Sequence, residues 1–180
     1  MNLRTTAPRR LLAAGALACA AALVPAAALA APGATAQAGH TATPACTTSG
    51  LDVWLDTQGN GTAGTTYFNL EFTNLSGSTC TLSGFPGVSA TDLNGNQLGS
   101  AAVRSGTPQS VTLANGATTI AVLGIRDAGA FSQSQCGLVT AAGLRVFPPN
   151  QTRAKKVPFP FGACSNGKGP VFLRVGPVTK

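Results

Sequence analysis

Residues that could perform acid–base or nucleophilic chemistry are scarce in this chain. The 180-residue sequence has a single histidine, His40, in a stretch of small residues near the N-terminus. A Ser-His-Asp or Cys-His arrangement needs a histidine beside its nucleophile, and His40 precedes the part of the chain expected to fold. A copper site with His and Met ligands also fails, because Met1 is the only methionine. We therefore expect no enzyme activity, no catalytic residues, no cofactor and no metal site.

The carboxylates offer the remaining route to catalysis. The sequence has five of them: Asp52, Asp56, Glu71, Asp92 and Asp127. In an extended strand, Asp52 and Asp56 would share one face at about 13 Å, which is wider than either glycosidase geometry. Pairing between strands could still bring Asp52 or Asp56 near Glu71. A carboxylate-dependent hydrolase therefore stays as the enzymatic alternative.

Four cysteines outside the N-terminal region can be paired from their spacing: Cys46, Cys80, Cys136 and Cys164. An even number of cysteines indicates disulfides if the chain is exported, as a signal-like N-terminus predicts here, and none of the four forms the CxxC half of a zinc site. Opposing residues of an antiparallel hairpin lie equally far from its turn. The midpoints, residues 63 and 150, fall in the turn-like segments QGNGTAGT (58–65) and PPNQ (148–151). This predicts the bridges Cys46–Cys80 and Cys136–Cys164, each closing a hairpin.

Short alternating segments predict strands rather than helices. In LDVWLD (51–56) the apolar residues share one face, and YFNLEFTN (67–74) repeats the pattern. Asn94-Gly95 and Asn115-Gly116 mark turns; a calcium loop at Asp92 is disfavoured because its glycine is misplaced. Further strands are expected at 87–93, 110–114, 117–125, 143–147, 154–159 and 170–176. This spacing indicates a β-sandwich.

The N-terminal residues predict export. Arg4, Arg9 and Arg10 precede an Ala- and Leu-rich run that ends in Ala28-Leu29-Ala30, which fits a cleavable signal peptide over 1–30. Arg9-Arg10 also leaves twin-arginine export open, and Cys19 leaves lipoprotein cleavage open. Residues 31–45 are expected to form a flexible Ala/Thr/Pro tether, and 46–180 one domain. We expect no transmembrane segment after cleavage.

Basic residues are concentrated near the C-terminus. Residues 46–127 contain two basic and five acidic residues, whereas 128–180 contain seven basic residues and no acid. Such a patch could hold an anionic wall polymer or anionic membrane headgroups, or it could protect an exposed sheet edge. Nucleic acid is not expected, because no aromatic residues are interleaved with the basic ones. The candidate patch comprises Arg145, Arg153, Lys155, Lys156, Lys168 and Arg174.

Trp54 is the basis of a weaker candidate surface. It alternates with Leu51, Val53 and Leu55 and so lies on the polar face of its strand, between Asp52 and Asp56. An exposed indole beside carboxylates could stack on a sugar ring, although a neighbouring loop often covers such a residue.

Three stretches resemble a family of secreted actinobacterial proteins, catalogued as domain of unknown function 4232. They are TTYFNLEFTNLSGSTCTLSGFPGVSA (65–90), VTLANGATTIAVL (111–123) and GLRVFPPNQT (143–152). The resemblance covers most of 46–180 and implies an export signal, a tether and an immunoglobulin-like sandwich. It implies no catalytic residues.

Together these features predict an immunoglobulin-like, antiparallel β-sandwich that is secreted and not an enzyme. The expected role is an envelope or extracellular module that binds an anionic cell-wall polymer or another envelope protein. A structural envelope protein without a defined ligand is the alternative. The sequence predicts no oligomeric state.

Overall fold

The computed structural model describes residues 42–180. The predicted signal peptide and the tether up to residue 41 lie outside the described residues. The ordered pairing begins slightly before Cys46, because the amide of Thr81 donates to Pro44 (2.8 Å) and the amide of Cys46 donates to Thr81 (3.0 Å).

Long strands with one apolar face build a five-stranded sheet. Its order is β1-β2-β8-β11-β6, and the first four strands pair antiparallel. The antiparallel arrangement is as predicted, and the two-residue strand β6, which pairs parallel to β11, is an exception at the edge of this sheet. The strands are β1 (Leu51–Thr62), β2 (Thr65–Asn74), β8 (Thr118–Arg126), β11 (Leu173–Thr179) and β6 (Val103–Arg104).

A four-stranded antiparallel sheet and a small two-stranded sheet complete the β structure. The four-stranded sheet has the order β10-β9-β4-β5, and β3 pairs with β7 in the small sheet. The strands are β10 (Lys155–Cys164), β9 (Leu138–Phe147), β4 (Gly87–Thr91), β5 (Gln97–Leu98), β3 (Cys80–Ser83) and β7 (Ser110–Leu113). Three short helical turns lie between strands: η1 (Thr48–Gly50), η2 (Ala128–Ala130) and α1 (Gln133–Cys136).

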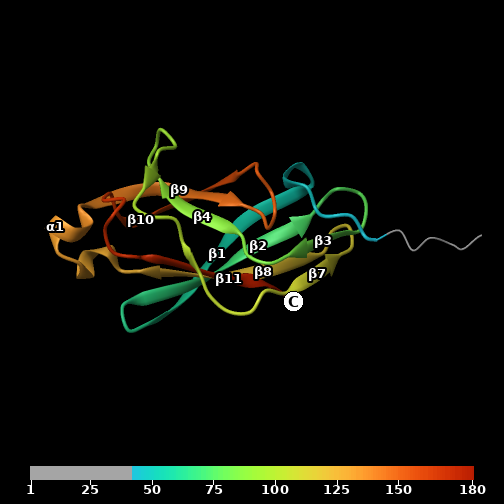
Figure 1. The fold of residues 1–180 in the computed structure, drawn as a ribbon, viewed down its shortest axis with the longest axis horizontal. Helices are drawn as coiled ribbons and strands as arrows, with labels where there is room; N and C mark the ends of the chain where they lie inside the picture. The colour runs from blue at the N-terminus through green and yellow to red at the C-terminus, as the bar shows by residue number, and fades with distance from the viewer. Residues whose placement is uncertain (1–41) are drawn as a thin grey trace, which may run out of the picture. The chain divides into compact units, whose positions relative to one another are not determined.

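The core lies between the two larger sheets, whose strands form separate layers in Figure 1. Alternate residues of β2 face this core, as the sequence pattern predicts, and Leu70 and Phe72 are fully buried there. Across the layers, Phe68 of β2 meets Phe159 of β10 edge to face at 5.0 Å between ring centroids. The all-β fold and all eight predicted strands are confirmed, whereas β3, β5 and β6 were not predicted. The immunoglobulin-like strand order stays a prediction.

Both predicted disulfides are confirmed. The hairpin argument holds for Cys136–Cys164, since Cys164 ends β10 and Cys136 lies just before β9. It is wrong in detail for the other bridge. Cys80 begins β3 instead of extending β2, and the segment before β1 approaches β3 in parallel through the Ala45–Thr81 bridge.

Candidate functional site

Two residues of the predicted basic patch lie side by side on the outer face of the four-stranded sheet. Lys156 of β10 is directly opposite Arg145 of β9, and Arg145 is opposite Ser89 of β4 on its other side. An Arg145 terminal nitrogen donates to Gln97 Oε1 at 2.9 Å. Its Nε is buried and has no hydrogen-bond partner among residues 42–180. Arg145 is therefore held at its tip while keeping one donor unused.

The remaining members of the patch are dispersed. Arg153 lies in the turn between β9 and β10, where its carbonyl accepts a hydrogen bond from Thr48 Oγ1 (3.1 Å). Lys155 pairs with Val146, which is fully buried, so the Lys155 side chain starts on the inner face of its sheet. Lys168 lies in the loop after β10, and Arg174 belongs to the five-stranded sheet. The structure thus brings together Arg145 and Lys156, with Arg153 and Lys155 near the adjacent turn.

The predicted Trp54 surface is open on the outer face of the five-stranded sheet. Trp54 is 44% exposed, so it is accessible to solvent. It lies opposite Glu71 of β2, while Asp56 lies opposite Asn69 and Asp52 opposite Thr73. Partial burial, with a smaller contribution from the negative charge of Asp56, raises the pKa of Glu71 above its usual value. Asp56 and Glu71 are therefore close enough to interact, as strand pairing allowed.

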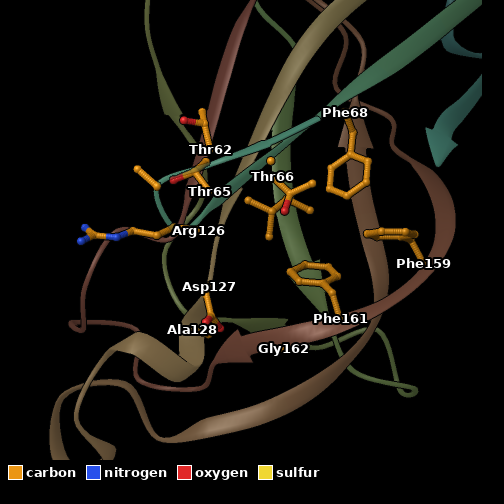
Figure 2. A pocket seen from close by; sticks show the side chains of 14 residues that line it. Thr62, Thr65, Thr66, Phe68, Arg126, Asp127, Ala128, Phe159, Phe161 and Gly162 are labelled. Carbon is orange, nitrogen blue, oxygen red and sulfur yellow. The ribbon is translucent and has the colours of Figure 1, made fainter. Parts of the chain in front are cut away.

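A cavity that was not predicted lies where the tip of the β1–β2 hairpin meets β10 and the end of β8. Its volume is about 530 Å³, which is in the range of small-molecule sites. Figure 2 shows three phenylalanines on one side of it, Phe68, Phe159 and Phe161, and threonines of the hairpin on the other. Phe159 and Phe161 are half-buried and lie 5.8 Å apart between centroids. The sequence feature that could have indicated these two residues is the alternation of phenylalanine with proline in PFPF (158–161).

The charges at the rim of this phenylalanine cavity already have partners. The guanidinium of Arg126 lies 4.8 Å from the centroid of the Phe131 ring. Asp127 Oδ1 accepts a hydrogen bond from the amide of Gly129 (2.9 Å). Because one rim residue is cationic and the other anionic, the lining favours an apolar or neutral group over an ion.

The described residues offer little for metal or redox chemistry. No group of three or more His, Cys, Asp or Glu side chains that could hold a metal ion occurs within 42–180. The four cysteines of that range are all in disulfides. In the same part of the chain, no helix has the length and apolar character needed to cross a bilayer.

Fold and surface together define a disulfide-linked, all-β domain with open sheet faces that carry clustered charge. The chain belongs to the family described as Domain of unknown function (DUF4232), whose profile matches residues 46–179. No curated protein and no solved structure shows significant similarity to this chain.

Proposed function

We propose that this protein is an exported, non-catalytic module that binds an anionic polymer of the cell surface. The pairing of Arg145 with Lys156 on one exposed sheet face carries the proposal. Two adjacent cations repel each other, so a bound anion relieves that repulsion. The hydrogen bond from Arg145 to Gln97 Oε1 limits the entropy lost when the guanidinium is fixed by a ligand.

Export is supported by the two disulfides, which persist in oxidising compartments outside the cytosol. The absence of catalysis is supported by the position of the carboxylate pair that strand pairing brings together. Asp56 and Glu71 are on an open sheet face and do not line the phenylalanine cavity. A general acid–base pair usually works in a cleft that excludes water, which this face does not provide.

A salt series with wall fragments tests the proposed binding. We expect the secreted protein to be retained on anionic wall fragments at about 0.1 M salt and released near 1 M, as the Debye length falls from about 10 to 3 Å. Lys156→Glu should weaken retention strongly, because Lys156 is exposed and its reversal places a carboxylate beside Arg145. Arg145→Gln should act in the same direction.

Lys168→Glu is the matched control, since it makes the same charge change on an exposed loop residue that belongs to no strand of the four-stranded sheet. It should leave most of the retention intact. If Lys156→Glu and Lys168→Glu reduce retention equally, only net charge matters and the Arg145–Lys156 site is refuted.

A structural role without a ligand is the second candidate, and strand β10 favours it. β10 pairs only with β9, so it is an edge of its sheet. Exposed lysines and prolines on an edge prevent pairing with other chains, and β10 carries Lys156, Pro158 and Pro160. Failure of the parent protein to bind wall fragments at low salt would favour this role.

A further inference from the structure

A second cationic site lies on the outer face of the five-stranded sheet, remote in sequence from Lys156. The sheet register places Tyr67 of β2, Gly124 of β8 and Arg174 of β11 in one row across three neighbouring strands. Arg126 is two residues further along β8 than Gly124, so it lies on the same face in the next row. Arg126 and Arg174 are therefore diagonal neighbours on adjacent strands, and the backbone positions of such residues are typically about 7–8 Å apart.

These residues line a cleft of about 200 Å³. Gly124 forms its base, because a Cβ at this position would stand only 3.1 Å from Cε1 of the Tyr67 ring. Any larger residue at 124 would push the ring away. The missing side chain thus lets the tyrosine ring lie against strand β8.

The cleft has cationic side chains and no carboxylate in its lining. Asp127, which follows Arg126 in the chain, lines the phenylalanine cavity instead and is bonded to the amide of Gly129. Arg126 is further positioned by its contact with the ring of Phe131, 4.8 Å away. Two like charges thus face one small cleft without an opposing charge in it.

We propose that Arg126, Arg174 and Tyr67 bind a phosphate or phosphodiester group. Guanidinium groups bind tetrahedral oxyanions through paired N–H donors, and phosphate has enough oxygens to accept from both arginines at once. The Tyr67 hydroxyl and the Thr65 hydroxyl, both from β2, add donors at the same cleft. This site lies on a different sheet from the Arg145–Lys156 pair, so its phosphate binding can be tested independently of the proposed function.

Titration of the full secreted chain with inorganic phosphate tests the site, with amide chemical shifts as the readout. We expect saturable shifts at Gly124 and its neighbours in the sheet. Arg126→Gln combined with Arg174→Gln should weaken binding at least about tenfold, because each removes a charge-assisted contact. Tyr67→Phe should weaken it by less and serves as a second variant that removes only a hydroxyl.

The control pair is Arg104→Gln with Lys168→Gln, which removes the same charge from exposed residues outside the cleft. Thermal unfolding should show that all variants fold. Phosphate shifts that survive unchanged in the Arg126/Arg174 variant, or that fall equally in the control, would overturn the proposal, as would the absence of saturable shifts in the parent.

Two further arms identify the source of the phosphate. A soluble polymer of glycerol phosphate that competes with inorganic phosphate would assign the site to a phosphodiester polymer. Competition only by phosphatidylglycerol vesicles, with phosphatidylcholine vesicles as the control, would assign it to a lipid headgroup. Competition by neither would restrict the site to free phosphate and refute the phosphodiester part of the proposal.

Discussion

At the scale of single residues, the ionised form of Glu71 lowers the stability of the folded protein. Its carboxyl group lies opposite Trp54 and near Asp56, and partial burial is the larger cause of its raised pKa. A carboxylate whose pKa is raised by folding binds its proton more tightly in the native state. Stability is therefore lost as the pH rises through the folded pKa.

Glu71→Gln removes this cost. We expect the variant to be more stable than the parent at pH 7, with the difference shrinking below the ordinary pKa of glutamate, where both states of the parent are protonated. Urea unfolding at pH 7 and pH 3 measures it. An equal gain in the free energy of unfolding at both pH values would show that the effect comes from packing and not from the charge of Glu71.

Asp92 provides a control of opposite sign. The Asn96 side chain donates to Asp92 Oδ2 at 2.9 Å, and this bond is the largest cause of a lowered pKa at Asp92. The carboxylate therefore contributes stability above its unfolded pKa, which is lost as the pH falls through the folded pKa. Asp92→Asn should destabilise the β4–β5 hairpin at pH 7 and have less effect at pH 3, in the same urea experiment.

At the scale of elements, the β9–β10 hairpin depends on one glycine. Its register shifts between Pro158 and Phe161, and Gly143 of β9 is the partner of Pro158. A Cβ at Gly143 would collide with the carbonyl oxygen of Val157 and would approach the amide nitrogen of Phe159 to 3.1 Å. Because these are backbone atoms, they cannot move without distorting the bulge.

Gly143→Ala should therefore destabilise the protein by about 1–3 kcal/mol, the usual range for overpacking. Gly87→Ala in β4 is the matched control, since its Cβ would meet Phe147 Cβ at an ordinary 3.5 Å. The control should be neutral or slightly stabilising, because alanine loses less backbone entropy than glycine. Similar losses in both variants, by urea unfolding, would contradict the steric argument.

The two disulfides constrain different parts of the fold and should contribute separately. Their sequence separations are 34 and 28 residues. On the chain-entropy model, closing loops of this size contributes roughly 3–4 kcal/mol each. We expect the double variants Cys46→Ala/Cys80→Ala and Cys136→Ala/Cys164→Ala to lose about that much in chemical unfolding. A variant that unfolds at the parent's denaturant midpoint would show that its bridge adds no stability.

For the whole molecule, four of the cations form two separate pairs, one on each of the two larger sheets. Arg145 and Lys156 share the four-stranded sheet, and Arg126 and Arg174 share the five-stranded sheet. Arg126 lies in the part of the sequence with net negative charge, residues 46–127. Summing charges along the chain therefore does not identify it as part of a cationic site. A protein with two cationic sites would hold a long polymer more tightly than either site alone.

The extent of the whole mature molecule depends on where the predicted signal peptide is cleaved. We expect cleavage after Ala30, because Ala28 and Ala30 supply the small residues that a signal peptidase requires. N-terminal sequencing of the protein from culture medium should begin at Ala31. A lipid-modified Cys19 at the N-terminus would contradict this start and would place the domain on a membrane anchor.

Local pattern was sufficient for much of this protein. Period-two alternation assigned buried and exposed faces to β1 and β2, because successive side chains of a strand must point to opposite sides. Cysteine positions and turn residues identified both disulfides, although only Cys136–Cys164 closes the hairpin from which it was inferred. The alternation is contained within a short segment of chain, whereas the cysteine pairs are separated by 34 and 28 residues.

Tertiary structure decided which distant residues meet. Nothing in β8 or β11 alone encodes the register that places Arg174 beside Gly124, because register depends on how whole strands pack their apolar faces. The same holds for the phenylalanine cavity, whose walls come from β2 and β10 in different sheets. Strand β6 spans two residues and carries no periodicity, so its parallel pairing with β11 follows only from the path of the surrounding chain.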